Sequence, residues 1–472
     1  MLTPNEQTIK LPPDVPQYFF DDALISQQMR LVRRWLPAAV FPKPVLEPDR
    51  PWEGRQLVLF GTVLPMPQGG YRLYYSCFTP AEASAKFLLA TSPDGFRWEK
   101  PELNAVAWQG STANNIVIDP TMHNDSPSVI FEPDDPQYPY KMITFHGTPD
   151  PAWTGGWGLY GYRSADGLQW ERLPGPLLVT GDRTNIMATK PDGKYVVYTR
   201  HPEMMTRHGA RSIYRSESED FLNWSELELV LTPDLDDEPD IEYYGMSVFE
   251  RHGWYFGLME YWDGLHDCVV TRLFISRDGK RWQKAGREPF IAPAYDWNRK
   301  WSGCDSHGPI IINDSMLFYF HGRLTSHHYD AARQWGVIGY ASLPLDHFCA
   351  LEAMSGGQLD TVPLVWPGGE LFLNADTRES YESHPGQTNG EITVAVLDEA
   401  GNPLPEWSGE QQAVFRGNTY CRNRLNDGTI RWPGERKMDA LKGQTIRLRF
   451  MLKHARLFTF QAGAIEGTRK PI

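Results

Sequence analysis

Short apolar runs that end in turns recur through most of the chain. Between residues 52 and 350, runs rich in Tyr, Val, Ile and Phe, such as YRLYYSCF and YVVYTR, alternate with clusters of Gly, Pro, Asp and Asn. Aromatic and β-branched residues favour pleated strands, whereas Gly, Pro, Asp and Asn favour turns. The pattern therefore predicts many short strands joined by tight turns, which is an all-β fold.

One turn pattern repeats itself in this region. Ser-x-Asp-Gly-x-x-Trp occurs in TSPDGFRWEK at 91–100, RSADGLQWER at 163–172 and SRDGKRWQKA at 276–285, with a degraded copy at 215–226. The Asp-Gly pair suits a hairpin turn, and the Trp can pack back over it. Strand-like runs flank each copy, so each unit is interpreted as four strands, the blade of a propeller. A fifth unit has SLPLDHF in place of the turn, so we expect a five-bladed β-propeller over residues 51–350.

The two ends of the chain differ from the repeats. In DDALISQQMRLVRRWL (21–36), apolar residues recur at every third or fourth position, which predicts a short helix within an N-terminal extension, residues 1–50. After the repeats, runs such as GEITVAVLDEAGNPL and TIRLRFMLKHARLFTFQA alternate polar and apolar residues without the repeated turn. They predict a C-terminal β-sandwich over residues 351–472, with a supporting role.

Composition and charge narrow the classes of protein and partner. The chain of 472 residues is 41% hydrophobic and 22% charged, as globular proteins are, and its formal net charge is −13. The negative charge argues against nucleic acid and anionic membranes as partners. The first twenty residues lack the basic and apolar regions of a secretory signal, so we expect a cytoplasmic protein, with homo-oligomerisation left open. Five scattered cysteines without a CxxC pair indicate reduced thiols rather than a zinc site.

An acidic residue stands near the start of the first strand of each repeat unit. These residues are Glu53, Asp125, Asp182, Glu242 and Asp305. The first strand of each blade lines the axis of a propeller, so we expect the five carboxylates to converge at one end of a central channel. Clustered carboxylates that shift one another's pKa mark acid–base sites. The alternative is that two or three of them merely cap turns or pair with arginine.

A five-bladed propeller with axial carboxylates, followed by a β-sandwich, resembles the glycoside hydrolases of families 32, 43 and 68. The resemblance covers residues 50–470 in architecture and a few residues in motif. It implies cleavage or transfer of furanosides and pentosides, with an acid from blade 1, an aspartate from a middle blade and a glutamate from the next. Asp182-Arg183 has two residue types of the family 32 Arg-Asp-Pro motif in reversed order, and Glu242 follows at comparable spacing. His307 matches a fifth-blade histidine that binds an axial ion or water.

We therefore expect a glycosidase that cleaves an oligosaccharide, a furanoside among the candidates, by carboxylate acid–base catalysis. Glu242 would be the general acid, Glu53 the base or nucleophile, and Asp182 the residue that orients the substrate and tunes the pKa of Glu242. Loop tryptophans suit stacking on a sugar ring. No cofactor or metal ligand is assigned, although a structural calcium ion at the axis is left open. The expected substrate contacts are Trp52, Asp125, Arg183, Trp301, Asp305 and His307.

Two other functions stay open at this point. A glycoside phosphorylase on the same fold would need a phosphate site of clustered basic residues, for which Arg183, Arg200, His201 and Arg207 are candidates. A non-catalytic carbohydrate-binding propeller would keep the aromatic rim but needs no opposed carboxylates. Carboxylates that point away from the axis would favour the binding protein.

Overall fold

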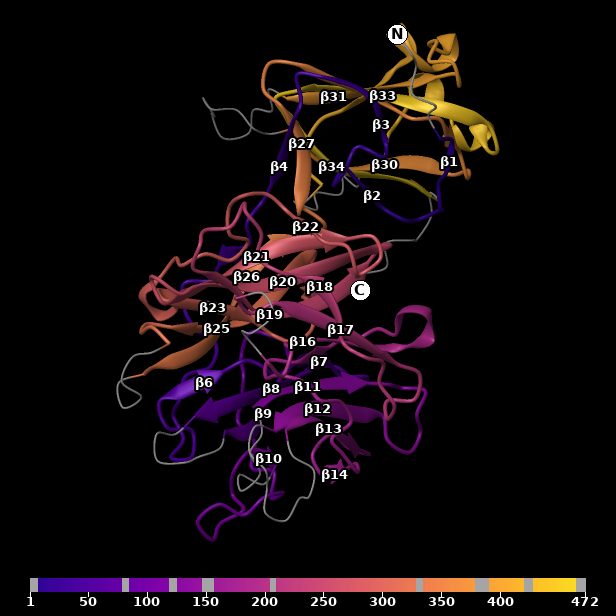
Figure 1. The fold of residues 1–472 in the computed structure, drawn as a ribbon. Coiled ribbons are helices and arrows are strands. Elements are labelled where there is room, and N and C mark those ends of the chain that lie inside the picture. The colour runs from indigo at the N-terminus through magenta and orange to yellow at the C-terminus, as the bar shows by residue number, and fades with distance from the viewer. Residues whose placement is uncertain are drawn as a thin grey trace. The chain divides into compact units, whose positions relative to one another are not determined.

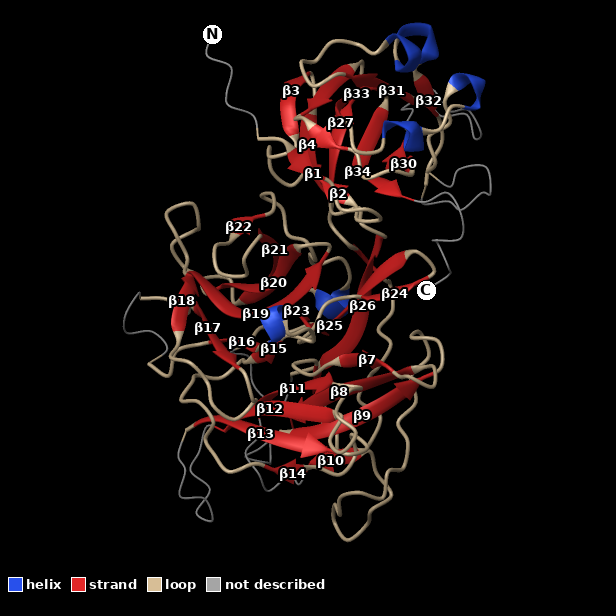
Figure 2. Cartoon of the chain, turned by 90° about the vertical axis from the view of Figure 1, so that its right-hand side faces the viewer, coloured by secondary structure: helices blue, strands red, loops and turns tan. Residues whose placement is uncertain are grey.

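The protein is nearly all β-strand, as the sequence predicts (Figure 2). The structure, a computed structural model, describes residues 7–78, 85–118, 125–146, 157–203, 209–327, 334–377, 390–419 and 428–463. No helix within these residues is long and apolar enough to cross a membrane. The helical segments among them are single 3₁₀ turns: η1 (Pro191–Gly193), η2 (Asp296–Asn298), η4 (Pro405–Trp407), η5 (Gly409–Gln411), η6 (Pro433–Glu435) and η7 (Met438–Leu441).

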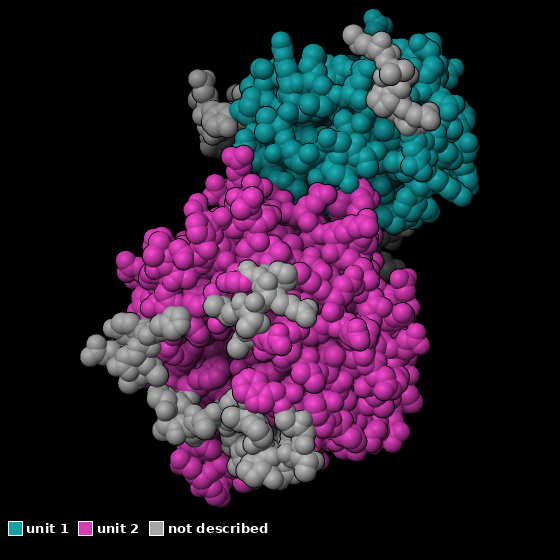
Figure 3. All heavy atoms as spheres, in the orientation of Figure 1, with its two compact units in different colours: residues 1–36, 313–315, 343–472 teal, residues 37–312, 316–342 magenta. Residues whose placement is uncertain are grey.

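The chain divides into two compact units, shown in different colours in Figure 3. Unit 2 contains residues 37–312 and 316–342, and therefore most of the repeat region. Unit 1 contains both ends of the chain, residues 1–36 and 343–472, together with residues 313–315.

Unit 2 is built from consecutive groups of antiparallel strands (Figure 1). In group 1, β6 and β7 both pair with β8, which pairs with β9. Groups 2 and 3 are separate four-stranded sheets whose strands follow one another in chain order. The strands of group 1 are β6 (Gln56–Val58), β7 (Val63–Pro65), β8 (Tyr71–Phe78), β9 (Lys86–Ser92) and β10 (Ile116–Ile118). Those of group 2 are β11 (Asp125–Phe131), β12 (Tyr140–His146), β13 (Gly158–Ser164) and β14 (Glu171–Arg172), and those of group 3 are β15 (Asn185–Ile186), β16 (Tyr195–Thr199), β17 (Ile213–Ser218) and β18 (Glu228–Leu231).

Group 5 is completed by a strand from the beginning of unit 2. Ala39 and Val40 of β5 (Ala39–Val40) pair with Ser342 and Ala341 of β26. The first and last parts of unit 2 are thereby held together by backbone hydrogen bonds. The strands of group 4 are β19 (Ile241–Arg251), β20 (Trp254–Asp263), β21 (Cys268–Ser276) and β22 (Gln283–Lys284), and those of group 5, besides β5, are β23 (Trp301–Cys304), β24 (Ile310–Ile312), β25 (Ser315–Arg323) and β26 (Gly336–Pro344).

Hydrogen bonds near the first strands link the five groups into a closed circle. Groups 5 and 1 are joined by the Ser306 amide, which donates to the Gly61 carbonyl at 2.8 Å. The parallel strand pairs β26–β6 and β21–β23 also join groups 5 and 1 and groups 4 and 5. Polar side chains add further links, and each reaches a backbone group of the neighbouring strand group. They are Val129 N to Thr62 Oγ1 at 3.0 Å, Ile186 N to Ser128 Oγ at 3.2 Å, Asn185 Nδ2 to Met246 O at 3.0 Å and Thr271 Oγ1 to Ser302 O at 2.7 Å. Residues from distant parts of the sequence therefore meet at the centre of unit 2.

The repeated turns have the geometry that their sequence predicts. Gly95 has φ of +79°, in the left-handed region that glycine tolerates best. The Gly95 amide donates to Ser92 Oγ at 2.8 Å, and the Trp98 indole returns to the Gly95 carbonyl at 3.1 Å. The same carbonyl accepts a hydrogen bond from the Tyr319 hydroxyl of group 5. Equivalent bonds join Tyr74 to Gly167 at 2.9 Å and Tyr198 to Gly279 at 2.8 Å, so each of these turns is fastened to a neighbouring group.

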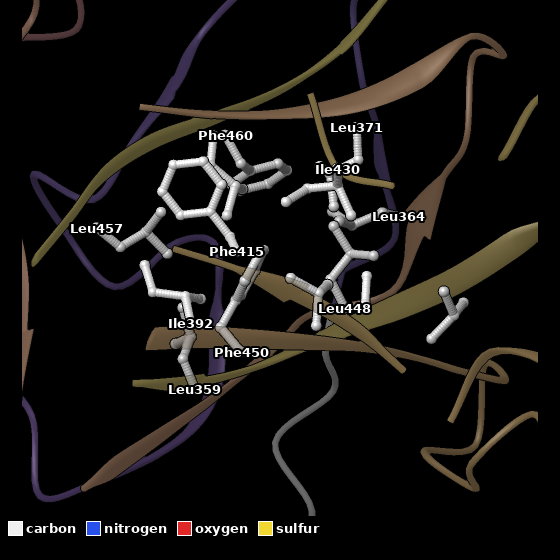
Figure 4. Close-up of a cluster of buried hydrophobic side chains, with 14 of the residues drawn as sticks. Leu359, Leu364, Leu371, Ile392, Phe415, Ile430, Leu448, Phe450, Leu457 and Phe460 are labelled. Atoms are coloured by element: carbon white, nitrogen blue, oxygen red, sulfur yellow. The ribbon is translucent and has the colours of Figure 1, made fainter. Parts of the chain in front are cut away.

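Unit 1 contains two sheets that share one buried apolar cluster, part of which is drawn in Figure 4. Phe450 of β33 and Phe460 of β34 meet in this cluster with their ring centroids 5.8 Å apart. The first sheet has β1 (Ile9–Lys10), β29 (Leu364–Val365), β33 (Thr445–Lys453), β28 (Gly357–Thr361), β3 (Ile25–Met29), β31 (Glu391–Leu397) and β32 (Ala413–Phe415). The second has β2 (Gln17–Tyr18), β34 (Ala455–Gly463), β27 (Cys349–Ala353), β4 (Val32–Trp35) and β30 (Glu370–Asp376).

The helix predicted for residues 21–36 is wrong. This segment forms β3 and β4, which pair with β28 and β27 respectively. The apolar residues that suggested a helix do not share a buried face, because Met29 is 54% exposed and Val32 is 57% exposed. Strand partners more than 300 residues away in the sequence therefore override the local helical spacing.

Candidate functional site

Two ion pairs lie beside the ring of Tyr244 in unit 2. Asp182 precedes β15, and its Oδ1 lies 2.7 Å from Nη2 of Arg200, which follows β16. Glu242, on β19, pairs with Arg211. The guanidinium carbons of Arg200 and Arg211 lie 4.4 and 5.5 Å from the Tyr244 ring centroid. Two of the three carboxylates that the sequence analysis proposed for catalysis, Asp182 and Glu242, therefore lie around one aromatic ring.

An aromatic cluster packs next to these ion pairs. The rings of Trp262 and Trp301 lie 5.7 and 5.2 Å from Tyr244, both in edge-on contact. The guanidinium carbon of Arg323 lies 4.3 Å from the Trp301 ring centroid. Trp301 is completely buried. Its predicted role as a sugar platform is therefore not what its position favours, and it instead supports Tyr244 and Arg323.

Both carboxylates and one arginine are partly exposed. The side chains of Asp182, Glu242 and Arg211 are 29%, 16% and 19% exposed, whereas that of Arg200 is 2% exposed. Burial lowers the pKa of the Arg200 guanidinium, but the charges of Asp182, Tyr244 and Asp125 raise it, and the net shift is upward. Asp125, at the start of β11, contributes to this upward shift. Its place in the site, like the convergence of all five carboxylates, stays a prediction.

Two arginine N–H groups at this place have no acceptor within the described part of the chain. They are Nη1 of Arg200 and Nε of Arg211. A buried donor without an acceptor is costly, and a ligand or water with oxygen acceptors satisfies it. The site therefore combines carboxylate acceptors with arginine donors.

Arg183 does not point to the same surface. Its Nε lies 2.6 Å from Oε2 of Glu260, and Nη1 and Nη2 donate at 3.0 Å to Asn185 Oδ1 and the Cys304 carbonyl. Its guanidinium carbon lies 4.4 Å from the ring centroid of Phe60. All of these partners lie inside unit 2, so substrate contact by Arg183 stays a prediction without support from its position.

Asp305 and His307 lie in the interior near Arg183. Neither carboxylate oxygen of Asp305 reaches a donor at normal geometry in the ranges the structure describes, although the amides of His307 and Val63 face it. Burial raises the pKa of the Asp305 carboxyl well above its usual range, and the charge of Arg183 only partly opposes this. Burial also lowers the pKa of His307 to about 3. Both side chains are buried, so their predicted hydroxyl contacts remain untested.

Glu53 and Trp52 belong to a different environment, next to β8 and β10. The Glu53 carboxylate accepts hydrogen bonds from Tyr75 at 2.7 Å and Lys100 at 2.8 Å, and from the amides of Asp49 and Arg50 at 3.0 Å. It is completely buried. These bonds favour a structural ion pair, and its catalytic assignment remains a prediction.

Trp52 is likewise engaged inside group 1. Its indole donates to Asn115 Oδ1 at 2.8 Å, and its ring meets Trp108 edge-on at 5.9 Å. Its contacts favour packing within group 1 over the predicted stacking on a sugar.

Glu260 is the buried acid that sequence reasoning missed. It lies in β20, whose sequence WYFGLMEYWD is apolar apart from this glutamate and its terminal aspartate. A charged residue within an apolar strand is costly unless it is paired, and this signal was visible in the sequence. The partner, Arg183, lies 77 residues earlier and could not be identified from spacing.

Metal binding finds no support among the described residues. No group of three or more His, Cys, Asp or Glu side chains there is arranged to hold a metal ion. The calcium ion left open by the sequence therefore has no ligand set in those ranges. Arg207, a candidate phosphate ligand, lies outside the described residues.

Comparisons with known proteins give structural neighbours only. No protein-family model matches the chain, and neither does any curated protein. An α-L-arabinofuranosidase from Podospora anserina is 15% identical with a TM-score of 0.46, covering 66% of this chain and 99% of that chain. A thermostable family-43 glycoside hydrolase is 16% identical with a TM-score of 0.45, covering 64% of this chain and 94% of that chain.

A β-1,2-mannobiose phosphorylase from Listeria innocua is a further neighbour. It is 12% identical with a TM-score of 0.45, and the match covers 68% of this chain and 98% of that chain. The resemblance to glycoside hydrolases expected from the sequence is thus found among solved structures. At this level of similarity, the chemistry has to be read from the site residues themselves.

Proposed function

We propose that unit 2 is a five-bladed β-propeller that carries a glycoside hydrolase site, and that unit 1 is a supporting β-sandwich. The five strand groups would be the blades, and their first strands would surround the axis. The circle of hydrogen bonds that joins Gly61, Ser128, Asn185, Met246 and Ser306 to neighbouring groups supports this arrangement.

The observation that carries the functional proposal is the pair of partly exposed carboxylates beside Tyr244, those of Asp182 and Glu242. Glu242 would act as general acid and protonate the glycosidic oxygen as the bond to the anomeric carbon breaks. Asp182 would have one of two roles. It would be either the base that takes a proton from the attacking water or the nucleophile that attacks the anomeric carbon. The role of base or nucleophile goes to Asp182 instead of Glu53, because Glu53 is buried with Lys100 in group 1.

The arginines would bind hydroxyl groups and control the charge of the site. Arg200 lies beside Asp182 and Arg211 beside Glu242, and each arginine has one N–H without an acceptor among the described residues. A sugar hydroxyl that accepts from these arginines and donates to Asp125 or Asp182 would fix the substrate beside the reacting carboxylates.

A glycoside phosphorylase is the second candidate, and the same arginines favour it. Guanidinium groups bind phosphate well, and Arg200, Arg211 and Arg323 all lie around the cluster of Tyr244, Trp262 and Trp301. In this reaction phosphate rather than water would attack the anomeric carbon. The two reactions are separated by assaying a panel of furanosides and pyranosides with and without inorganic phosphate, and by identifying a sugar phosphate or a free sugar as product.

We expect Asp182→Asn and Glu242→Gln each to reduce turnover by about a hundredfold or more, the scale of lost acid–base catalysis. Glu250→Gln is the matched control, because Glu250 is an exposed residue of the same strand as Glu242. Turnover on the best substrate of the panel is compared, and circular dichroism at the assay temperature verifies that each variant is folded. Near wild-type turnover in either folded variant would remove that residue from the mechanism. A protein that binds sugars but turns over none would be the non-catalytic alternative.

A further inference from the structure

The ion pair between Arg183 and Glu260 is the most deeply buried one at the centre of unit 2. Both side chains are 1% exposed, and Nε lies 2.6 Å from Oε2. Replacing a buried ion pair by apolar residues of similar size is often neutral or stabilising, because the desolvation of two charges offsets their attraction. Stability alone therefore does not explain this pair.

Two glycines on neighbouring first strands leave the space that the pair occupies. A Cβ atom added to Gly245 of β19 would lie 2.3 Å from Cγ of Arg183 and 2.9 Å from Oε2 of Glu260. A Cβ atom added to Gly303 of β23 would lie 2.2 Å from Oε1 of Glu260. Neither glycine has a positive φ, so what each provides is room rather than backbone freedom. The structure is thus built around this pair from both sides.

The pair also holds the backbone next to Asp182. Arg183 has φ of +57°, a left-handed conformation that is unfavourable for a residue with a long side chain. Its guanidinium group is fixed by Glu260, Asn185 and the Cys304 carbonyl. The side chain of Arg183 points into the interior, and the preceding side chain, Asp182, is partly exposed with its Oδ1 2.7 Å from Nη2 of Arg200.

We propose that Glu260 is a positioning residue, which acts through Arg183 to hold the carboxylate of Asp182 in its reactive orientation. The inference rests on the proposed function, in which Asp182 acts on the substrate or the attacking water. Glu260 itself touches no reactant. Its second oxygen, Oε1, lies with Nε1 of Trp301 around Gly303, and neither atom has a hydrogen-bond partner within the described ranges. The charge of Glu260 is therefore directed at Arg183.

The test replaces both members of the pair, because Glu260→Gln alone would leave the Arg183 charge buried without a counter-charge and could unfold the protein. The double variant Arg183→Met/Glu260→Gln removes both charges and keeps similar volumes. We expect its unfolding midpoint to stay close to that of the wild type and its kcat to fall about a hundredfold, with KM little changed, as for a displaced reacting group. A folded double variant with wild-type kcat would overturn the proposal.

A second variant moves Glu260 without changing any charge. Gly303→Ala places a Cβ atom 2.2 Å from Oε1 of Glu260 and 2.7 Å from both Trp301 Nε1 and His321 Cε1, so the Glu260 carboxylate and these two rings have to shift, and kcat should fall. The matched control is Gly264→Ala on the same unit, where the nearest atom to an added Cβ is the Asp240 carbonyl oxygen at 3.2 Å. Lys284→Met/Asp237→Asn, which removes another ion pair of group 4 with its nitrogen and oxygen 2.9 Å apart, controls for the loss of charge. Equal kcat in Gly303→Ala and its control would speak against positioning.

Adding Asp182→Asn separates positioning from a general loosening of the site. If Glu260 works through Asp182, then Asp182→Asn should reduce kcat about a hundredfold in the wild type but only a few-fold in the double variant. The reason is that the double variant has already lost the contribution of a correctly oriented Asp182. If the two reductions in kcat multiply, the pair acts independently of Asp182. That result would overturn this inference but not the proposed function. If Asp182→Asn has no effect in the wild type, the proposed function itself fails.

Discussion

At the scale of single residues, two acids with the same predicted place have opposite environments. Glu53 is buried with Lys100 and Tyr75, whose charge and hydroxyl stabilise its carboxylate. Asp305 is equally buried, but the nearest cation, Arg183, already pairs with Glu260. Burial therefore raises the pKa of Asp305 well above its usual range. The surroundings of an acid, rather than its place before a strand, decide whether it is charged.

Asp305→Asn should stabilise the protein, and the gain should increase with pH. A carboxyl whose pKa is higher in the folded than in the unfolded state binds more protons when folded, so the stability present below pH 4 is lost as pH rises toward the folded pKa. The amide does not titrate and avoids this loss. We expect the free energy of unfolding of the variant to exceed that of the wild type at pH 8, and the difference to be smaller at pH 4. Urea unfolding at both pH values measures this, and a variant less stable than the wild type at pH 8 would contradict it.

At the scale of elements, the repeated turn both closes a hairpin and joins strand groups. The Gly95 carbonyl accepts from Trp98 in its own turn and from Tyr319 in group 5. The sequence predicts the first contact, because Ser, Asp, Gly and Trp lie within seven residues of one another. The second contact was not predicted, since Tyr319 lies 224 residues further along the chain. The turn therefore also contributes to the closure of unit 2.

Gly95→Val should destabilise unit 2 by more than backbone strain alone. The strained backbone contributes roughly 1–3 kcal/mol, since a β-branched residue resists a φ of +79°. In addition, the new Cβ would lie 2.6 Å from Cδ1 of Ile312 and 3.2 Å from the Tyr319 hydroxyl oxygen. Gly69→Val is the control, because Gly69 also has a positive φ but no atom within 4 Å of an added Cβ. Chemical denaturation of both variants measures the difference, and equal losses would mean that the contacts with group 5 are unimportant. The KM of the folded fraction should not change.

At the scale of the whole molecule, unit 1 is assembled from both ends of the chain. Strands β1 and β3 extend one sheet, and β2 and β4 extend the other, although all four precede the repeat region. Phe19, between β2 and β3, is completely buried and meets Phe460 with ring centroids 5.8 Å apart. The N-terminal segment is therefore part of the core of unit 1.

Phe19→Ala should destabilise unit 1 by about 3–5 kcal/mol, the usual effect of removing a buried phenylalanine. Leu235→Ala is the control, because Leu235 is fully exposed and should change the stability little. Scanning calorimetry measures the unfolding transition of each variant. If Phe19→Ala behaved like the control, the N-terminal segment would be a separate extension, as its sequence pattern suggested.

The sequence by itself determined the features that depend on neighbours in the chain. The strand period, the Asp-Gly turns and the return of Trp98 over Gly95 all follow from contacts between residues a few positions apart. The same local information also placed Asp182 and Glu242 at strand beginnings. Because the first strands of successive repeat units were expected to surround one axis, these two residues were expected to lie close together.

Tertiary structure decided everything that depends on distant partners. Residues 21–36 satisfy the spacing of a helix, yet they form strands because β27 and β28 supply edges from the other end of the chain. Glu53 and Glu242 look alike in sequence, but only Glu242 reaches the surroundings of Tyr244. The sequence pattern predicted Arg183 as a substrate ligand, whereas the structure pairs its side chain with Glu260. Burial and charge pairing arise between groups of strands, so no local pattern could fix which acid is exposed, which is neutral and which holds another in place.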